Sequence, residues 1–495
     1  MTHPISRRRV IVLSGLGAVG VAAGVTGWIA GTAGAGPGDR LQPGDTGAEL
    51  AQPLLHDSRD GRLDVALTAA AGARTAGRDT SALGYNGTSP GPTLRVRPGD
   101  ELAVRLTNGL DQPTNLHTHG LRVSPQGNSD NPFVTIDPGS TFDYLYRIPP
   151  DHPAGTFWYH AHHHGTVADQ TFGGLVGALL VDRGPDLPVV ADRILLISDT
   201  TLDGAGRIVA TGAMDRAMGR RGELVLVNGQ HQPTVSATPG AAQRWRLINT
   251  CTSRVLDIRL AGHELVQVAH DGTFLPVPVA RDRIVLAPGN RADVVVRPTG
   301  PGRHALTAEP AGQGGMGGMG GMGGGGMGSG DPVGGPITLA TMVTEGANSA
   351  SPPLPATLPA ETPPAGPATA QRRIAFRMAM GGMSTGGMAF TIDGRVFDGD
   401  RDDQTITLGT TEEWTVTNTG PLAHPFHLHV WPFTVLASSD AALPIGVPQD
   451  VVLIPANGWV RLRIPFTTFP GRSVYHCHIL DHEDAGMMAT VNVRG

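Results

Sequence analysis

Hydrophobic and polar residues alternate along much of the chain, and one alternating unit occurs three times. Its copies are TLRVRPGDELAVRLTN (93–108), TVSATPGAAQRWRLIN (234–249) and TITLGTTEEWTVTN (405–418). In each copy, apolar residues at every second position indicate a strand, a short turn and a second strand that ends at an asparagine. The pattern predicts a hairpin that recurs once per domain, as three successive β-sandwich domains would require.

A second repeat follows the first and concerns histidine. Nine residues after the closing asparagine, the first copy has His117, in NLHTHG, and the third copy has His427, in PFHLHV. The second copy has Ile258 at that position, and Leu260 where another histidine would stand. Further along, FWYHAHH in the first domain parallels VYHCHI in the third. Domains 1 and 3 therefore carry paired histidines at equivalent positions, whereas we expect domain 2 to be a structural spacer.

These repeats divide the chain into five parts. We expect a signal segment (1–35), a first domain (36–185), a second domain (186–345), a Pro/Ala-rich linker (346–370) and a third domain (371–495).

The second domain contains a low-complexity segment, residues 312–330, in which glycines separate four methionines. These are Met316, Met319, Met322 and Met327. A shorter methionine cluster follows between residues 378 and 388.

The N-terminus looks like an export signal. Paired arginines at 7–9 precede a mildly apolar stretch, residues 10–30, and the small residues 33–35 would suit cleavage. This order resembles a twin-arginine signal, which exports folded proteins. The alternative is an uncleaved membrane anchor, because about 20 residues can just span a bilayer, although the glycines here make a poor transmembrane helix. We expect an exported protein (periplasmic, cell-wall or secreted) without stable membrane insertion after cleavage.

The composition supports strands and limits the partners. Of 495 residues, 70 are Gly and 41 are Pro, and only 16% are charged, which favours turns and short strands over helices. A hydrophobic content of 40% excludes wholesale disorder. The net charge is −6 and lysine is absent, so the chain has no basic footprint for nucleic acid. Two cysteines cannot form a disulfide framework.

Four His-x-His pairs carry the candidate chemistry. In a strand, residues i and i+2 point to the same face, so each pair presents two imidazoles side by side. Neutral imidazole suits copper, zinc or iron, and one ion cannot use eight of them. We therefore expect a multinuclear site clamped between domains 1 and 3. The pairs are His117/His119, His160/His162, His427/His429 and His476/His478.

Cys477 lies between the two histidines of the last pair, so its side chain points to the opposite face of the strand. With His424, His482 and Met487 it forms a His₂Cys set with a distant thioether, the pattern of a blue-copper electron-transfer site. One strand would thus place its thiolate on one copper ion and the flanking histidines on another.

The remaining histidines and the second cysteine have simpler interpretations. We expect His163 and His164 to lie around the site or at the surface rather than to bind metal. The scattered histidines of domain 2 are expected to be structural, and Cys251, on an apolar strand, is expected to be a buried structural thiol.

The motifs HTHG, YHAHH, HPFHLH and HCHILDHEDAGMM resemble the four copper motifs of three-domain multicopper oxidases, over about residues 50–495. The last motif is similar to that of the bacterial cuprous oxidases of periplasmic copper efflux. The resemblance implies an all-β fold of three consecutive cupredoxin-like Greek-key β-sandwich domains, and four copper ions per chain. It assigns a type 1 copper to His424, Cys477, His482 and Met487, a type 2 copper to His117 and His427, and a type 3 pair to His119, His160, His162, His429, His476 and His478.

The reaction implied by the resemblance couples one-electron oxidation of substrate at the type 1 copper to four-electron reduction of dioxygen to water at the other three ions. Proton delivery then needs acids near this cluster. Glu483 matches the proton-relay glutamate of the family, and Asp130 is a second candidate catalytic residue. The alternative for Asp130 is a loop carboxylate that caps a turn.

The sequence leaves the substrate open. Thioethers favour Cu(I), so the methionines of 312–330 could collect cuprous ions for copper tolerance, or they could be incidental in a flexible insertion. Gly420 and Leu422 stand where the cuprous oxidases have an Asp and a Met that help bind substrate copper, which weakens this interpretation. The alternatives are a laccase for phenols and aromatic amines, and a non-catalytic copper-binding envelope protein. One chain can close its own cluster, so a monomer is the simplest expectation.

Overall fold

The computed structural model describes residues 40–182, 184–310, 336–362, 366–380, 388–441, 443 and 445–495. The predicted signal segment (1–35) and the methionine loop (312–330) lie outside the described residues. In the described part the chain is almost entirely β-structure, arranged in six sheets that form three consecutive cupredoxin-like sandwiches, which confirms the predicted fold class. Within these described ranges, three short helices lie between strands: α2 (Val167–Gly173), α3 (Ala213–Met218) and α4 (Leu480–Asp484). No helix of these ranges combines the length and the apolar character that a membrane crossing needs.

The first sandwich consists of a five-stranded and a four-stranded sheet. In spatial order the five-stranded sheet is β1 (Leu55–Asp57), β4 (Thr93–Val96), β9 (Val176–Val181), β8 (Gly155–His160) and β6 (His117–His119). The four-stranded sheet is β3 (Arg78–Tyr85), β2 (Arg62–Thr75), β5 (Glu101–Asn108) and β7 (Thr141–Arg147).

The second sandwich consists of a six-stranded and a five-stranded sheet. The first is β11 (Leu224–Val227), β10 (Ala191–Thr200), β13 (Gln243–Asn249), β18 (Arg291–Val296), β15 (Leu265–His270) and β16 (Thr273–Arg281). The second is β12 (Thr234–Ala237), β20 (Ile337–Thr344), β19 (Gly302–Pro310), β14 (Leu256–Leu260) and β17 (Ile284–Leu286).

The third sandwich repeats the strand counts of the second. Its six-stranded sheet is β22 (Met388–Ile392), β21 (Ala370–Met380), β24 (Thr410–Asn418), β29 (Trp459–Phe466), β26 (Phe433–Ser438) and β27 (Pro448–Gln449). Its five-stranded sheet is β23 (Gln404–Thr407), β31 (Met488–Arg494), β30 (Gly471–Cys477), β25 (His424–Leu428) and β28 (Val451–Ile454).

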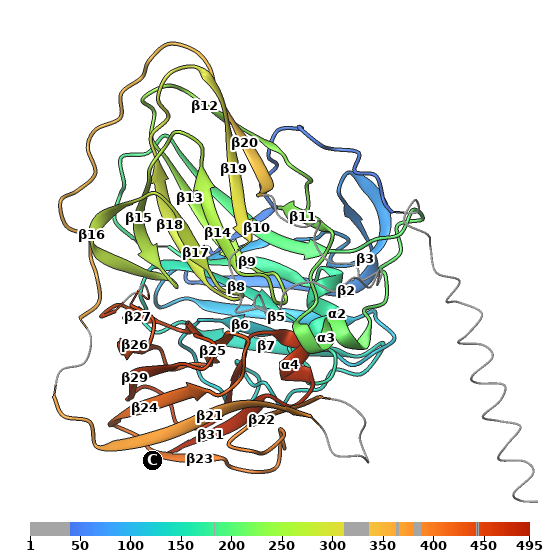
Figure 1. Cartoon of the computed structure of the whole chain (residues 1–495), viewed down its shortest axis with the longest axis vertical. Helices are drawn as coiled ribbons and strands as arrows, with labels where there is room; N and C mark the ends of the chain where they lie inside the picture. The colour runs from blue at the N-terminus through green and yellow to red at the C-terminus, as the bar shows by residue number, and fades with distance from the viewer. Residues whose placement is uncertain are drawn as a thin grey trace, which may run out of the picture.

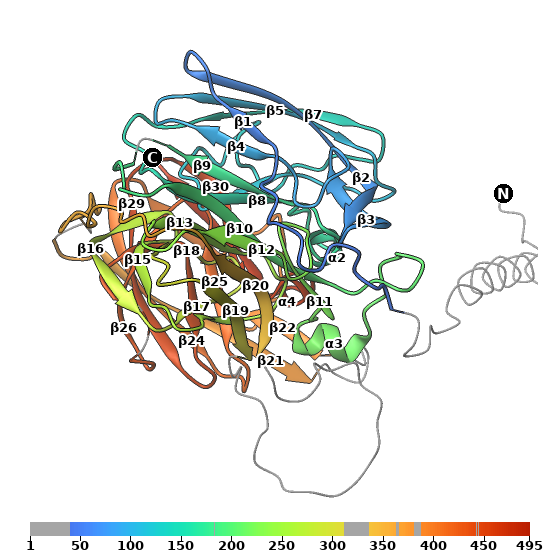
Figure 2. The same ribbon diagram turned by 90° about the horizontal axis from the view of Figure 1, so that it is seen from above.

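The three domains are packed around a common centre rather than strung out in a line. In Figure 1 the second domain (green and yellow) lies above, the third (orange and red) below, and the first (blue and cyan) behind and to the right. Figure 2, viewed from above, shows the first and third domains meeting beneath the second. The helices α2, α3 and α4, one from each domain, contact one another through α4. Domain 3 thus touches domains 1 and 2 through α4, and domains 1 and 2 touch each other where β8 packs against β13 and β18.

The predicted hairpin is wrong in one respect, because the two strands of each repeat do not pair with each other. In the first copy β4 pairs with β1 and β9 of one sheet, while β5 pairs with β2 and β7 of the other. The other two copies behave in the same way. Each repeat is an arch that carries the chain from one sheet to the opposite one. Alternation with a period of two fixes which side chains face the core but does not identify the partner strand.

The asparagine that closes each repeat has the same structural role in all three domains. The side-chain amide of Asn108 donates to the carbonyl oxygens of Gln112 and Ile136, each at 2.8 Å. Asn418 does the same toward Leu422 and Pro455, at 2.6 and 3.0 Å. Asn249 makes the equivalent pair of bonds in domain 2. A buried amide thus anchors the loop that, in domains 1 and 3, leads directly to the histidine motif.

Two connecting segments bind the domains together. The N-terminal segment that precedes β1, assigned from the sequence to domain 1, lies along domain 2, where Leu50 is buried in the core and its backbone N–H donates to Thr234. The chain between β20 and β21 forms no helix or strand in its described part. Its Glu361 nevertheless forms a bidentate ion pair with Arg122 of domain 1, with N–O distances of 2.5 and 2.6 Å.

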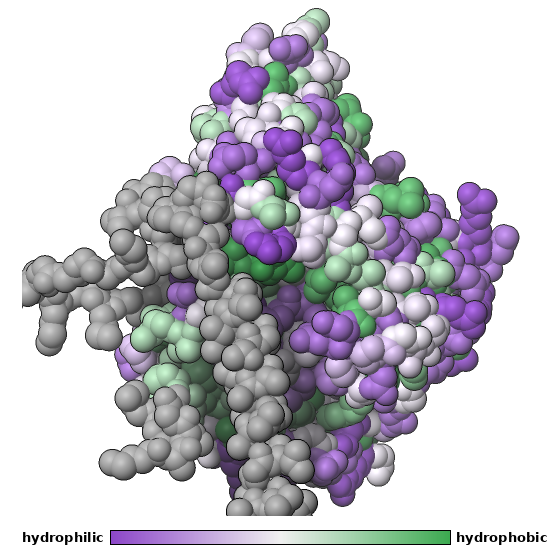
Figure 3. All heavy atoms as spheres, turned by 90° about the vertical axis from the view of Figure 1, so that its right-hand side faces the viewer, coloured by the Kyte–Doolittle hydropathy of each residue, from purple (hydrophilic) through white to green (hydrophobic). Residues whose placement is uncertain are grey.

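The visible surface carries no special apolar face. Figure 3 shows hydrophobic residues in small patches between hydrophilic ones on the side that it presents. Among the described residues, the large hydrophobic side chains with most exposure include Leu54, Val190 and Met214, which come from different parts of the chain. Single exposed hydrophobic residues of this kind are normal for a globular protein.

Candidate metal centres

Eight histidines of the four His-x-His pairs meet at the interface of domains 1 and 3. In domain 1, β6 and β8 are antiparallel neighbours with His117 opposite His160, and in domain 3, β25 and β30 are neighbours with His427 opposite His476. The pairing brings all four motifs to facing strand ends. All eight side chains are buried. Rings from the two domains stack directly, with centroids 3.7 Å apart for His117 and His429.

The hydrogen bonds of these histidines fix which ring nitrogen faces the centre. The Nδ1–H groups of His160 and His476 donate to the carbonyl oxygens of the following residues, at 2.9 and 3.0 Å. Nε2 of each ring is then an unprotonated lone pair. Burial lowers the pKa of both rings well below the ordinary value, so both are neutral.

Several of these lone pairs point at one another, which is the observation that a metal would explain. His117 and His427 each donate through Nδ1, to Asp130 and to the backbone oxygen of Asp450, and their Nε2 atoms lie only 3.5 Å apart. Nε2 of His476 is 3.2 Å from Nε2 of His162 and 3.1 Å from that of His429. The lone pairs of His117 and His427 cannot form a hydrogen bond with each other, but a cation between them would bind both.

The third group of ligand atoms has no polar partner at all in the described part of the chain. It consists of Nδ1 of His119, Nε2 of His160 and Nε2 of His478, and these residues form a cluster whose ligand atoms lie within 4.8 Å of one another. Buried polar atoms are normally satisfied. Three orphaned imidazole nitrogens that converge in one place therefore fit a metal ion, and imidazole suits copper.

A second centre lies on the other side of β30. Sγ of Cys477 is 3.4 Å from Nδ1 of His424 and 3.9 Å from Nδ1 of His482, and the two Nδ1 atoms are 3.4 Å apart. Met487 is buried in the same core and is tied to both ligand segments, since its N–H donates to the carbonyl of His482 and its carbonyl accepts from the N–H of Cys477. The structure brings all four predicted type 1 ligands into one buried region.

The chemistry of this donor set also fits a soft cation. Burial raises the pKa of the Cys477 thiol well above its ordinary value, so the ligating thiolate needs a bound cation to stabilise it. Burial lowers the pKa of His424 to about 4, which leaves that ring neutral and ready to bind. The backbone N–H of Ile479 donates to Sγ at 3.4 Å, as expected for a sulfur that carries negative charge.

The two candidate proton-carrying residues lie against the cluster in different ways. Glu483 is buried on α4, with Oε2 3.1 Å from Nδ1 of His476 and Oε1 3.4 Å from Nε2 of His162. Burial raises the pKa of this carboxyl well above its ordinary value. Both oxygens of Asp130 lie 3.0 Å from Nδ1 of His117, and Oδ1 also accepts from the N–H of Thr118 at 2.9 Å. Asp130 thus holds a ring, while Glu483 is a neutral acid whose two oxygens make no well-aligned hydrogen bond within the described residues.

The residues expected to lie outside the centres do so. His163 is half-buried with Nε2 3.3 Å from Oγ1 of Thr135, and the ring of His164 packs edge-on against Phe397. Neither belongs to a group of potential metal ligands in the described residues. Cys251 is a buried free thiol, as predicted.

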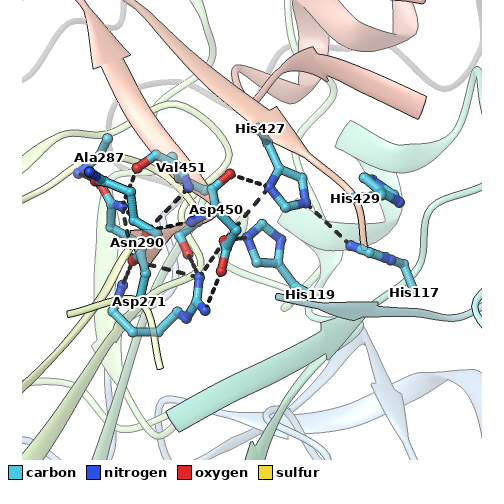
Figure 4. A network of polar contacts seen from close by, with 12 residues as sticks. His117, His119, Asp271, Ala287, Asn290, His427, His429, Asp450 and Val451 are labelled. Atoms are coloured by element: carbon cyan, nitrogen blue, oxygen red, sulfur yellow. Dashed lines mark hydrogen bonds and ion pairs between the residues drawn. The ribbon is translucent and has the colours of Figure 1, made fainter. Parts of the chain in front are cut away.

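Domain 2 contributes residues to the surroundings of both centres, which the sequence did not indicate. Arg291 and Asp271 of this domain, together with Asp450 of domain 3, form a buried polar network beside His119 and His427. Figure 4 shows Asp450 between Asp271 and the histidines. Arg291 at the start of the buried strand RADVVV, and a single aspartate before VVLI, were the available signals, and neither is distinctive alone.

The second missed element is α3 of domain 2, which covers the type 1 ligand set. The Nε2–H of His482 donates to the backbone oxygen of Ala217 at 3.1 Å, and the ring of Phe390 stacks on the other side with a centroid separation of 4.2 Å. As a result His482 has no exposed surface. Nothing in the short sequence AMDRAM indicated this position.

Comparison with known proteins agrees with this geometry. A family model described as multicopper oxidase matches residues 67–186, and two further models with the same description match 192–322 and 367–495. The multicopper oxidase mco of Staphylococcus haemolyticus is 27% identical over 427 residues, which cover 84% of each chain.

Two solved structures extend the comparison to the fold. The multicopper oxidase of Campylobacter jejuni, a metallo-oxidase, has a TM-score of 0.81 at 29% identity, over 93% of this chain and 98% of its own. The laccase-like multicopper oxidase of Ochrobactrum sp. has a TM-score of 0.74 at 26% identity, over 90% of this chain and all of its own.

Proposed function

The chain belongs to the multicopper oxidase family of oxidoreductases, and we propose that its principal substrate is Cu(I), oxidised at a type 1 copper with dioxygen as the electron acceptor. Phenols and aromatic amines are then poorer substrates. We choose Cu(I) as the substrate because Ala217 and Phe390 cover the ring of His482.

A large aromatic donor has no direct access to the type 1 ligands. In a site of this kind the ring edge of a ligating histidine is the natural entry point for electrons, since it joins the metal to the protein surface. Here the Nε2–H of His482 is occupied by the carbonyl oxygen of Ala217, and Phe390 covers one face of the ring. A phenol would have to transfer its electron to His482 through α3. A donor bound on α3 itself would lie close to the hydrogen bond between Ala217 and His482.

The helix α3 presents the donor atoms that a cuprous ion prefers. Met214 and Met218 stand four residues apart, so their side chains share one face of the helix. They are 73% and 47% exposed, which is unusual for methionine. Met218 is the immediate neighbour of Ala217. Thioether sulfur selects Cu(I) over harder ions, and these two residues would form a binding surface one residue away from the bond to His482.

Further methionines stand on the same side of the type 1 ligand set. Met388 is exposed on β22, two residues before Phe390 and on the same face of the strand. Met378 of β21 is near His424, since a Cβ built on Gly420 would lie 3.8 Å from its sulfur and 3.9 Å from Nε2 of that histidine. These thioethers offer an alternative to the Asp and Met that this chain lacks at Gly420 and Leu422. The solved relative from Campylobacter jejuni, described as a metallo-oxidase, supports the same choice.

The residues that would hold copper follow from the geometry above. His424, Cys477, His482 and Met487 would hold one ion, His117 and His427 a second, and the remaining six histidines a pair, so that four ions per chain are proposed. Copper bound there supplies one-electron transfer from the substrate and the four-electron reduction of dioxygen to water. His119, His160 and His478 would hold one ion of the pair, and His162, His429 and His476 the other.

The protein's own residues connect and protect these ions. Cys477 shares a backbone segment with His476 and His478, which is the shortest covalent link between the two centres. Burial of all ligands excludes bulk water and limits the release of partly reduced oxygen. Glu483, held neutral by burial between two cluster histidines, would donate protons there.

Export by the twin-arginine route, a monomeric state and Cu(I) collection by residues 312–330 stay predictions from the sequence.

The test is oxygen consumption by the copper-loaded protein with Cu(I) and with dimethoxyphenol as alternative donors. We expect faster uptake with Cu(I), and a several-fold loss of kcat/KM for Cu(I) in a variant with Met214→Leu and Met218→Leu, because leucine keeps the packing but has no sulfur. The phenol rate of the same variant is the control and should not fall. A wild-type preference for the phenol, together with an unchanged Cu(I) rate in the variant, would identify a laccase instead.

A parallel deletion of residues 312–330 separates the contribution of the methionine loop. A lower Cu(I) rate with an unchanged phenol rate would support a role in collecting the substrate. Unchanged Cu(I) turnover, or a higher phenol rate alone, would show that the loop at most restricts access.

A further inference from the structure

Domain 2 supplies no histidine or cysteine to the groups of potential metal ligands in the described residues, yet one of its side chains reaches their centre. Arg291 is the first residue of β18 and is completely buried. Its Nε–H donates to the backbone oxygen of Thr156 in domain 1 at 3.2 Å, and both terminal nitrogens bind Asp450 of domain 3. A single guanidinium therefore joins all three domains.

The contact between Arg291 and Asp450 has the geometry of a strong, directional pair. Nη1 lies 2.7 Å from Oδ1 and Nη2 lies 2.6 Å from Oδ2, a parallel two-bond arrangement that fixes the plane of the carboxylate. Asp271, also of domain 2, holds the backbone around this pair. It accepts from the N–H of Arg291 at 2.9 Å and from the N–H of Val451 at 3.1 Å.

Asp450 in turn contacts one histidine from each of domains 1 and 3. Its Oδ1 is 3.0 Å from Nε2 of His119, and its backbone oxygen is 2.8 Å from Nδ1 of His427 (Figure 4). A carboxylate oxygen can only accept, so Nε2 of His119 carries the proton and Nδ1 is the free lone pair. This is the reverse of His160, whose Nδ1–H is bonded and whose Nε2 is free.

The ion pair between Arg291 and Asp450 occupies the space beside Gly120 of the first histidine motif, HTHG. Gly120, which follows His119, has φ +83°, and a Cβ at that position would meet both Asp450 and the guanidinium of Arg291. Glycine is thus required there for two reasons, the backbone conformation and the space for the ion pair.

We propose that Arg291 is a positioning residue for the histidine cluster. Domain 2, which supplies no histidine to these ligand groups in the described residues, uses Arg291 to fix the carboxylate of Asp450. Asp450 in turn fixes the tautomer and orientation of His119 so that Nδ1 faces the metal. Docking of domain 2 is thereby coupled to copper binding at the set His119, His160 and His478. The inference rests on the copper assignment proposed above and is independent of the choice of substrate.

The test compares Arg291→Lys with Arg246→Lys in the full-length protein. Arg246 is a matched control, because it is buried in the same domain, binds Asp192 through two bonds at 2.7 and 2.8 Å and also contacts Thr156. None of its hydrogen bonds or ion pairs within the described residues is to a histidine. Lysine keeps the positive charge of each pair and removes the two-bond geometry. The readouts are copper per chain, the type 1 and type 3 absorbance bands, and the type 2 electron paramagnetic resonance signal.

For Arg291→Lys we expect an intact type 1 band, a diminished type 3 band, and copper affinity at the cluster about 10- to 100-fold lower, the range found when partners of metal-binding histidines are removed. Arg246→Lys should keep all signals. Full type 3 absorbance together with unchanged copper affinity in Arg291→Lys would overturn the proposal. Equal losses of copper and type 3 absorbance in both variants would also overturn it, because they would indicate that each substitution only loosens the domain interface.

A second variant covers the case in which Arg291→Lys does not fold. Asp450→Asn leaves Arg291 with the carbonyl oxygens of Thr156 and Gly289 and with Asp271 at 3.6 Å. The same selective loss of type 3 signal is expected, and full type 3 signal would contradict the proposal. If the wild-type protein showed no type 3 signal, the copper assignment itself would be refuted. If it showed a normal type 3 band but poor Cu(I) turnover, only the proposed substrate would be refuted.

Discussion

Oε2 of Glu483 lies 3.1 Å from Nδ1 of His476, inside a buried region where neither oxygen of the carboxyl group makes a well-aligned hydrogen bond within the described structure. Burial holds the pKa of this group well above its ordinary value. A neutral acid that stands beside the cluster histidines is in position to give up a proton when charge develops on reduced oxygen.

Replacement of Glu483 by Gln should therefore slow oxygen reduction by about 100-fold or more, the usual contribution of a positioned general acid. Glutamine has nearly the same shape, so the type 1 absorbance band and the copper content should not change. Stopped-flow reoxidation of the fully reduced protein measures the step directly. Wild-type reoxidation by the variant would remove Glu483 from proton delivery.

The two cysteines provide a matched pair for testing the type 1 assignment. Cys477→Ser should abolish the intense blue absorbance, because that band needs a thiolate ligand, while the trinuclear signals remain. Cys251→Ser should keep the blue colour, since Cys251 is a buried thiol that belongs to no group of potential metal ligands in the described residues. Blue absorbance that survives the first substitution, or disappears with the second, would contradict the assignment.

Asp130 gives a prediction for the type 2 copper. Both of its oxygens face Nδ1 of His117, and the same carboxylate accepts from the N–H and hydroxyl of Thr118. Asp130→Asn should weaken the type 2 electron paramagnetic resonance signal and lower copper affinity by about 10-fold or more, since the ring loses a charged partner. The type 1 band should stay. An unaltered type 2 signal would leave Asp130 with no more than the role of a turn cap.

Much of this architecture could be predicted from the sequence, because the information is periodic. Alternation of apolar residues and the three copies ending in asparagine identify the sandwiches, and spacing of two residues between histidines identifies imidazoles on one strand face. These rules depend only on local chain geometry. The repeat was therefore enough to show that His117 and His427 stand at equivalent positions in domains 1 and 3, nine residues after Asn108 and Asn418.

The contributions that could not be predicted all cross a domain boundary. Arg291 and Asp450 are separated by 159 residues, and each looks ordinary in its own segment. Ala217 acts through its backbone oxygen, for which the side chain carries no signal. The error about the hairpins has a related origin, because the pattern that defines a strand says nothing about which strand pairs with it. Non-local contacts thus set the limits of what the sequence could show.

The buried histidines give the copper-free protein a defined dependence on pH. Burial holds the pKa of His424 to about 4 and that of His478 to about 3, and lowers those of most other cluster histidines strongly. Below about pH 6.5 the unfolded chain binds protons that the folded protein excludes, so the free energy of unfolding falls as pH falls, by up to about 1.4 kcal/mol per histidine and pH unit. Buried carboxyls with raised pKa values, such as Glu483, oppose this trend but are fewer.

Denaturant titrations of the copper-free protein at pH 7 and pH 5 should therefore show a lower free energy of unfolding at pH 5. The variant with His424→Gln and His482→Gln should show a smaller decrease between the two pH values. Equal stability at both pH values would mean that these histidines are not excluded from protons in solution.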